Sequence, residues 1–517
     1  MEYQFVNAQV QFSNLEELIK VGNDASQLVL LGRVDAIVDY ENLDYLKSKA
    51  DIDNAVEKAL TQYLAEPKYF HQLSVLTGDF VILQLVSNEL IKIITSDSLS
   101  PKLTVYYRQH QGQLNISNDF RILTEDIDFT LVDTYDADLL EHCSRARGGL
   151  PGKTYLHEVK KLDVRSIYSI TSTTIKKEAV IYPSQFRENM TVEDYISVVG
   201  KKLPDETYSL AYSTGIDSHV LLSSHSDKID ELCTYYFSYP NLGIEKTKAS
   251  GASVIQAIQR GMTLPKLISV DECDPFGVEF LKHNASFQIY SSHLALNFYR
   301  LAQESKNDHL ILGETADAMA GFFTHTNEIV LQTLWSDRKR LMWRIVDLLN
   351  FRRKMNKRYF KESLAHVLSC YDDKGRLKEN IDLNAKAAVW PLFLYFKSSQ
   401  KIMNSVATVF AAGDFFNKKI YCPYSEPLSH FAASQWNKSF ASVFDPKIEI
   451  RKKYNYISDE EIHGQIHKPI GDVQGSILDS ILDELTQSLP ELSKHLKTIG
   501  VNKRSSVHIA CLALAEE

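Results

Sequence analysis

A short polar turn between an expected strand and an expected helix has the residue types that bind phosphate. The turn is Ser213-Thr214-Gly215-Ile216-Asp217-Ser218. Backbone N–H groups at such a turn and at a helix N-terminus have no intrahelical partner, so they favour an anion. The hydroxyls of Ser213 and Ser218 add donors, and Gly215 lets the backbone approach a phosphate closely.

The carboxylate of Asp217 indicates a metal ion beside the phosphates. It would repel a phosphate unless a divalent cation lay between them, and one or two carboxylates plus phosphate oxygens are typical ligands of Mg²⁺. A strand-to-helix turn capped by Asp or Ser is the alternative. On this segment alone the two interpretations are equally good.

A second acidic turn follows the apolar run 309–312 and contains Gly313, Glu314 and Asp317. Ligands of a parallel α/β sheet bind outside the carboxyl ends of its strands, so we expect both turns at one edge of the sheet. Asp217 and Asp317 would then share one metal ion. An ordinary acidic loop is the alternative interpretation.

Together the two turns resemble the asparagine synthetase family. Residues 213–218 are similar to the SGGxDS pyrophosphate-binding loop of N-type ATP pyrophosphatases, and residues 313–321 to GEGADELFGGY of asparagine synthetases. The family includes β-lactam synthetases and lasso-peptide macrolactam synthetases. Weaker similarities to its synthetase domain occur at residues 422–426 and 467–472, and to its amidotransferase domain at residues 78–80, 97, 105–107 and 114–117.

The resemblance implies ATP and Mg²⁺ as substrate and cofactor. Mg²⁺ would lie between Asp217 and Asp317, Lys468 would stabilise charge on the acyl and phosphoryl oxygens, and Glu314 would orient the amine or accept its proton. The residues implied at the ATP and pyrophosphate site are Ala211, Ser213, Thr214, Gly215, Asp217, Ser218, Ser238 and Gly313. A solvated surface lysine is the alternative for Lys468.

Several positions depart from the family pattern. Glutamine-hydrolysing members use a cysteine at position 2, where this chain has Glu2, so we expect no glutaminase activity. Thr214 and Thr315 replace glycines of the two motifs, and Ala318 replaces a glutamate. We expect Thr214 to be tolerated only with a negative φ.

The elements expected from residue patterns divide the chain near residue 185. Before it, strands are expected at 27–31, 80–86, 90–95 and 155–171 and a helix at 55–64. After it, strands at 208–212, 234–238, 266–270 and 309–312 alternate with helices at 195–202, 246–260 and 287–304; beyond residue 328 the pattern is almost wholly helical. This alternation predicts a parallel sheet covered on both faces.

With the resemblance, the expected fold class is α/β and α+β. Residues 1–185 would form a degenerate glutamine-amidotransferase-like domain of the layered, Ntn-hydrolase-like β type. Residues 186–517 would form an asparagine-synthetase-like ATP-pyrophosphatase domain with a parallel sheet and extra helices.

Composition limits the classes of partner. The 517 residues carry a formal net charge of -9, which gives no general attraction to nucleic acid or an anionic membrane. The six cysteines form no CxxC pair and the histidines show no metal-ligand spacing. No signal peptide or transmembrane run is recognisable, so we expect a cytoplasmic protein. A basic run at residues 352–361 is interpreted as a solvated helix face rather than an anchor for an acidic ligand.

The expected function is that of an ATP-dependent, AMP- and pyrophosphate-forming ligase that joins a small-molecule or peptide carboxylate to an amine or ammonia, with a partner protein as one source of substrate. Lactam, macrolactam and sugar-acid amide formation all fit, and the oligomeric state stays open. The alternative is a non-catalytic nucleotide-binding relative. A tRNA-modifying pyrophosphatase shares the 213–218 turn, but the acidic net charge and the 313–321 turn weaken that reading.

Overall fold

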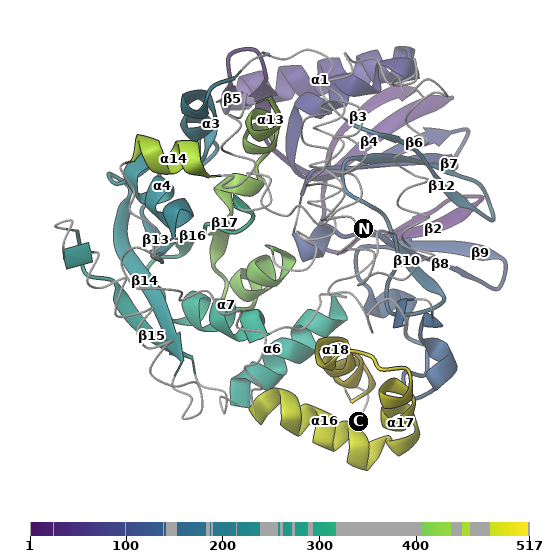
Figure 1. Ribbon diagram of the computed structural model, residues 1–517. Helices are drawn as coiled ribbons and strands as arrows, with labels where there is room; N and C mark the ends of the chain where they lie inside the picture. Colours follow the sequence, from purple (N-terminus) through teal and green to yellow (C-terminus); the bar gives the residue numbers. More distant parts are fainter. Residues whose placement is uncertain are drawn as a thin grey trace, which may run out of the picture.

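The structure is a computed structural model that describes residues 2–23, 25–98, 100–137, 139–140, 152–181, 187, 190–213, 215–237, 257–258, 262–270, 275–287, 293–316, 406–435, 447–454 and 476–514. Layered N-terminal strands occupy one side of the molecule and a parallel sheet the other (Figure 1). The molecule is therefore a mixed α/β protein with several sheets, one of them parallel, as the sequence predicts at this coarse level.

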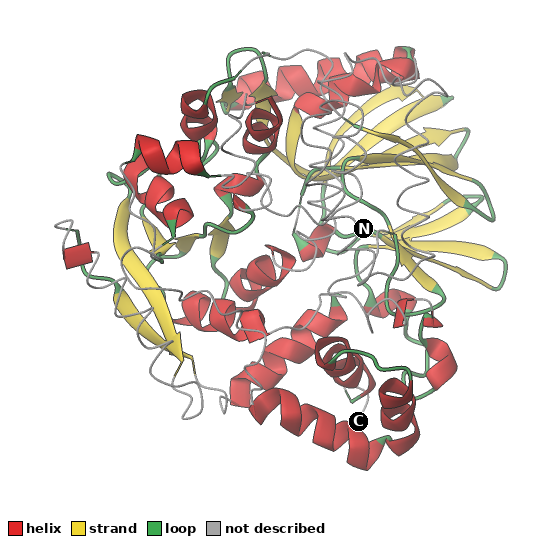
Figure 2. Ribbon diagram, in the orientation of Figure 1, coloured by secondary structure: helices red, strands yellow, loops and turns green. Residues whose placement is uncertain are grey.

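Two sheets and a long helix form the N-terminal layers (Figure 2). The first sheet has the order β1-β2-β9-β8-β10, with bounds Glu2–Gln4, Ala8–Gln11, Gln113–Ser117, Tyr106–His110 and Val159–Lys161. The second has the order β12-β11-β7-β6-β4-β3, with bounds Ile175–Val180, Ser166–Ile170, Glu89–Thr95, Leu76–Val86, Ser26–Asp39 and Glu17–Asn23, and β5 (Asp44–Leu46) pairs with β4. Helix α1 (Lys49–Ala65) is followed by the 3-10 helix η1 (Pro67–Val75).

Alternation of apolar residues along β4 and β6 explains the layering. Leu31 and Leu83 belong to the apolar cluster shared with the first sheet, whereas Leu30 and Ile82 belong to the cluster that includes Tyr63 of α1. Successive side chains of a strand point to opposite faces, so a strand that is apolar on both faces is covered on both. The central sheet is thus packed between the first sheet and the helix.

The second part contains a five-stranded sheet whose strands all pair in parallel. Its order is β15-β14-β13-β16-β17, with bounds Lys266–Val270, Ile229–Phe237, Tyr208–Ala211, His309–Ile311 and Lys419–Tyr421. The strands predicted at 208–212, 266–270 and 309–312 are confirmed to within one residue. Strand β17 was not predicted, because Ile420 is the one apolar aliphatic residue in it and gives no strand pattern.

Helices flank this sheet and extend beyond it. They are α3 (Val192–Val198), α4 (Ile216–Ser224), α6 (Pro275–Ser286), α7 (His293–Glu304), α13 (Pro427–Gln435), α14 (Ile448–Lys453), α16 (Ser476–Ser488), α17 (Pro490–Thr498) and α18 (Lys503–Ala513). Residues 406–415 are also helical, and short 3-10 turns are η2 (Pro101–Leu103), η3 (Arg121–Leu123), η4 (Val132–Thr134) and η6 (Pro423–Ser425). None of the described helices has the length and apolar content needed to cross a bilayer.

Several predicted boundaries need correction. Helix α3 begins at residue 192 because Thr191 and Asp194 form a reciprocal capping box, which is the start signal present in the sequence, but it ends at residue 198 rather than 202. The predicted 155–171 strand is two shorter strands, β10 and β11. Helix α6 was missed. Most of the predicted 246–260 helix and residues 317–405 lie outside the described residues.

The two parts share one apolar core. A single cluster joins residues of β4 and β5, such as Tyr45, with the parallel sheet and the C-terminal helices. Hydrogen bonds cross the contact as well: the Tyr106 hydroxyl donates to the Phe287 carbonyl at 2.7 Å, and the backbone N–H of Leu428 donates to the Tyr45 hydroxyl at 3.1 Å. The boundary at residue 185 stays a prediction, because this packing does not define one.

A close crossing of β4 and β6 depends on two glycines. Gly32 has a φ of +101°, and a Cβ placed on it would lie 2.2 Å from the Asp79 carbonyl oxygen. Gly78 has a φ of +147°, and its Cβ would lie 2.5 Å from the Arg33 carbonyl oxygen. The register of the two strands shifts between Val34 and Ala36, immediately beside these contacts. Only residues without a Cβ allow this approach.

We expect Gly32→Ala to lower the free energy of unfolding by about 3 kcal/mol, because strain from a left-handed backbone adds to a clash with a neighbouring strand. Gly112→Ala is the matched control: Gly112 has a φ of +78° but no described atom within 4 Å of its Cβ position, so it should lose only about 1 kcal/mol. Urea denaturation measures both. Equal losses would contradict the role given to the crossing.

Candidate functional site

The predicted phosphate loop lies between β13 and α4, at the carboxyl edge of the parallel sheet. The Ser218 hydroxyl donates to the Ser213 carbonyl at 2.8 Å and accepts the Ser213 N–H at 3.1 Å. The Ser213 hydroxyl accepts the N–H of Gly215 at 3.1 Å. Both serine side chains therefore hold the shape of the loop, in addition to any part they take in binding. Ala211 ends β13 immediately before the loop.

The second acidic turn lies directly against this loop. Strand β16 pairs in parallel with β13, with Leu210 opposite Ile311. The segments that follow the two strands therefore leave the sheet at the same edge. A Cβ placed on Gly313 would lie 3.5 Å from the Cβ of Asp217 and 3.6 Å from the backbone nitrogen of Ser218. The two turns are thus at one edge of the sheet, as predicted, and they meet at Gly313. Thr214, Ser238, Asp317 and Lys468 lie outside the described residues.

A lysine that the sequence analysis missed forms an ion pair with Asp217. The Nζ of Lys447 contacts Oδ2 of Asp217, and the lysine side chain is only 7% exposed against 23% for the aspartate. Lys447 directly precedes α14 and is 230 residues from Asp217 in the chain. The Tyr424 hydroxyl donates to the Asp217 carbonyl oxygen at 2.9 Å and so holds the backbone of the loop. No local pattern identifies Lys447, since a lysine before a helix is common.

The turn at 313–316 is strained. Thr315 has a φ of +71° and is the only β-branched residue with a positive φ among the described residues. A left-handed backbone costs a non-glycine residue about 1–2 kcal/mol. Thr315 is also 2% exposed, and its hydroxyl has no hydrogen-bond partner in the described part of the chain.

Glu314 lies near the end of β17. Burial raises the pKa of the Cys422 thiol well above its ordinary value, and the charge of Glu314 adds to that effect. A buried thiol with a raised pKa is a poor nucleophile, so Cys422 serves packing. Glu314 itself is half-buried.

The chemistry of Asp217 fits a magnesium ion that is shared with phosphates. No group of three or more His, Cys, Asp or Glu side chains suited to a metal occurs within the described residues. Mg²⁺ sites at nucleotides need fewer protein ligands, since one or two carboxylates suffice when phosphate oxygens complete the shell. Asp217 fits that role, although its carboxylate pairs with Lys447 here.

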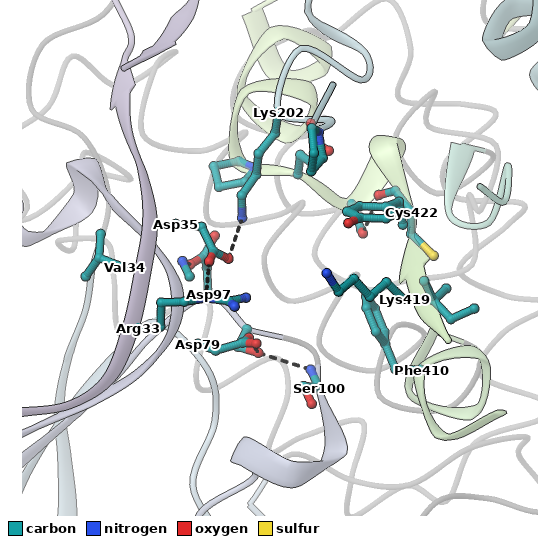
Figure 3. Close-up of a pocket in the computed structure, with 18 of the residues that line it drawn as sticks. Arg33, Val34, Asp35, Asp79, Asp97, Ser100, Lys202, Phe410, Lys419 and Cys422 are labelled. Carbon is teal, nitrogen blue, oxygen red and sulfur yellow. Dashed lines mark hydrogen bonds and ion pairs between the residues drawn. The ribbon is translucent and has the colours of Figure 1, made fainter. Parts of the chain in front are cut away.

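A separate cavity of about 620 Å³ lies between the N-terminal layers and β17 (Figure 3). Lys202 reaches Asp35 across 3.7 Å, and Lys419 extends into the cavity from the opposite wall. Burial raises the pKa of the Glu426 carboxyl to about 8, although Lys202 and Lys47 act in the other direction. One oxygen of Glu426 has no hydrogen-bond partner within the described ranges. Cys422 lines this cavity and also lies near Glu314, so the cavity borders the candidate site.

Comparison with known proteins adds no relative. No protein-family model matches the chain, and no curated protein does.

We expect Glu426 to make the protein less stable as pH rises. The folded state keeps the Glu426 proton up to about pH 8, whereas the unfolded chain releases it near its ordinary pKa of 4.5. The unfolded state binds fewer protons across this window, so stability falls with increasing pH. Relative to Glu426→Gln, the wild type should lose up to about 1 kcal/mol per pH unit between about pH 5 and 8. Urea denaturation at pH 5, 6, 7 and 8 tests this, and a constant difference would contradict it.

Proposed function

We propose that this chain is an ATP-dependent, AMP- and pyrophosphate-forming amide synthetase. The observation that carries the proposal is the contact of two polar turns at the carboxyl edge of a parallel sheet, with Asp217 and Lys447 paired beside them. Such an edge is where α/β sheets bind ligands, and the residue types are those needed for phosphates. The substrate would be a small-molecule or peptide carboxylate together with an amine or ammonia.

The first step would be adenylation. An oxygen of the substrate carboxylate attacks the α-phosphorus of ATP, the bond from that phosphorus to the β-phosphate bridging oxygen breaks, and pyrophosphate leaves. The backbone N–H groups that start α4 face the phosphates, and Lys447 places a cation beside them. Mg²⁺, with Asp217 and the predicted Asp317 as ligands, supplies charge neutralisation when bound.

The second step would form the amide. The amine nitrogen attacks the acyl carbon, the bond from that carbon to the AMP oxygen breaks, and the nitrogen gives up a proton. Glu314 lies on the turn beside the phosphate loop and is proposed to orient the amine and accept that proton. Lys468 keeps its proposed role at the acyl and phosphoryl oxygens. The amine would come from free ammonia, from the substrate itself or from a partner protein.

We expect wild-type protein given ATP, Mg²⁺ and a small-molecule and peptide extract to release AMP and pyrophosphate. Asp217→Asn and Lys447→Met should each lower AMP release by about 100-fold, because the first removes the proposed metal ligand and the second removes a cation beside the phosphates. Mass spectrometry of AMP, ADP and pyrophosphate measures this. Thermal melts of each variant establish that it is folded, since Lys447→Met leaves a carboxylate without its partner.

Lys453→Met is the matched control for Lys447→Met. Lys453 ends the same helix but is partly exposed and pairs with Glu193 at 3.4 Å, away from the turns. It should release AMP at the wild-type rate. Release of ADP instead of AMP would contradict cleavage at the α-phosphate. ATP binding without any cleavage, with all extract fractions tried, would favour the non-catalytic alternative.

A further inference from the structure

Thr315 combines two unfavourable features at one position. Its backbone is left-handed, with a φ of +71°, and its buried hydroxyl has no hydrogen-bond partner among the described residues. A glycine would remove both, since it adopts such a backbone without strain and has no hydroxyl. Strained residues and unpartnered buried polar groups persist mainly where a function uses them. The pairing of the two features therefore points to a use for the hydroxyl.

The position of the turn indicates what the hydroxyl would meet. Gly313 lies against Asp217 and Ser218 of the phosphate loop. Two residues span at most about 7 Å, so Thr315 lies within reach of a phosphate chain bound at that loop. The described charged groups of this turn and loop are Glu314, Asp217 and its partner Lys447. A neutral hydroxyl donor suits a phosphate oxygen there, because it adds no further negative charge.

We propose that Thr315 is a nucleotide-binding residue whose hydroxyl donates a hydrogen bond to a phosphate oxygen of bound ATP. The inference depends on the proposed function and adds a residue to its site. The whole residue is only 2% exposed, so the turn itself must shift to bring the hydroxyl to the phosphate. Glycine, which the family motif has here, offers no such donor.

The test compares Thr315 variants by titration calorimetry with the Mg²⁺ complex of α,β-methylene-ATP, which cannot be cleaved at the α-phosphate. Thr315→Val keeps the shape and removes the donor, Thr315→Gly removes the side chain, and Thr315→Ser keeps the hydroxyl. We expect the Kd to rise about tenfold for Thr315→Val and Thr315→Gly, the effect of one hydrogen bond to a charged group. Thr315→Ser should stay within about threefold of the wild type.

Melting temperatures separate binding from stability. Thr315→Gly should raise the melting temperature by a few degrees, since strain and an unpartnered hydroxyl are both removed. Thr124→Val is the matched control: the Thr124 hydroxyl donates to the Phe120 carbonyl at 3.1 Å in the N-terminal layers, so this variant should melt earlier and bind the nucleotide normally. A loss of affinity together with a gain of stability at Thr315 cannot come from misfolding.

Three results overturn the proposal, and they are distinguishable. If the wild type binds the nucleotide and Thr315→Val binds it equally well, the hydroxyl makes no contact and the proposed function still stands. If the wild type does not bind the nucleotide at all, both the role of Thr315 and the proposed function fail. Weaker binding by Thr315→Ser than by Thr315→Val would also overturn it, since the donor would then be unfavourable.

Discussion

Parallel pairing of β13 with β16 is the constraint on which the candidate site depends. Leu210 lies opposite Ile311, so β13 and β16 end next to each other at the same edge of the sheet. The two turns then lie side by side, with the Cβ position of Gly313 at ordinary van der Waals distance from Asp217 and Ser218. A slip in this register would separate the turns and remove the shared surface, even if every residue of both motifs stayed unchanged.

Electrostatics imposes a second condition on this edge. A half-buried Asp217 next to a second acidic turn needs compensation, and Lys447 supplies it from a segment far along the chain. Separating a buried cation from its partner is costly, so the pair also fixes α14 over the start of α4. Under the proposed function, the same lysine would also offset the negative charge of bound phosphates.

Local patterns predicted many of the elements and the shared edge of the two turns, but not the contacts made by individual side chains. The strands at 208–211, 266–270 and 309–311 follow from short stretches of sequence, and the structure contains them. Lys447 was missed because its partner is distant and nothing nearby distinguishes it. The φ of Thr315 and the internal bonds of Ser218 were also unpredictable, since they follow from how the loops fit together. Strand β17 exists through pairing with β16 rather than through its own pattern.

The N-terminal layers also support the candidate site. They share an apolar core with the parallel sheet, and their close β4–β6 crossing presents Arg33 and Asp35 to the cavity beside β17. Strand β17 is the edge of the described sheet on that side and has no further strand to cover it. Packing against the layers shields this edge, and β17 in turn supports β16 and the turn that carries Glu314 and Thr315. The N-terminal layers therefore have a structural role, because they stabilise the strand next to the candidate site.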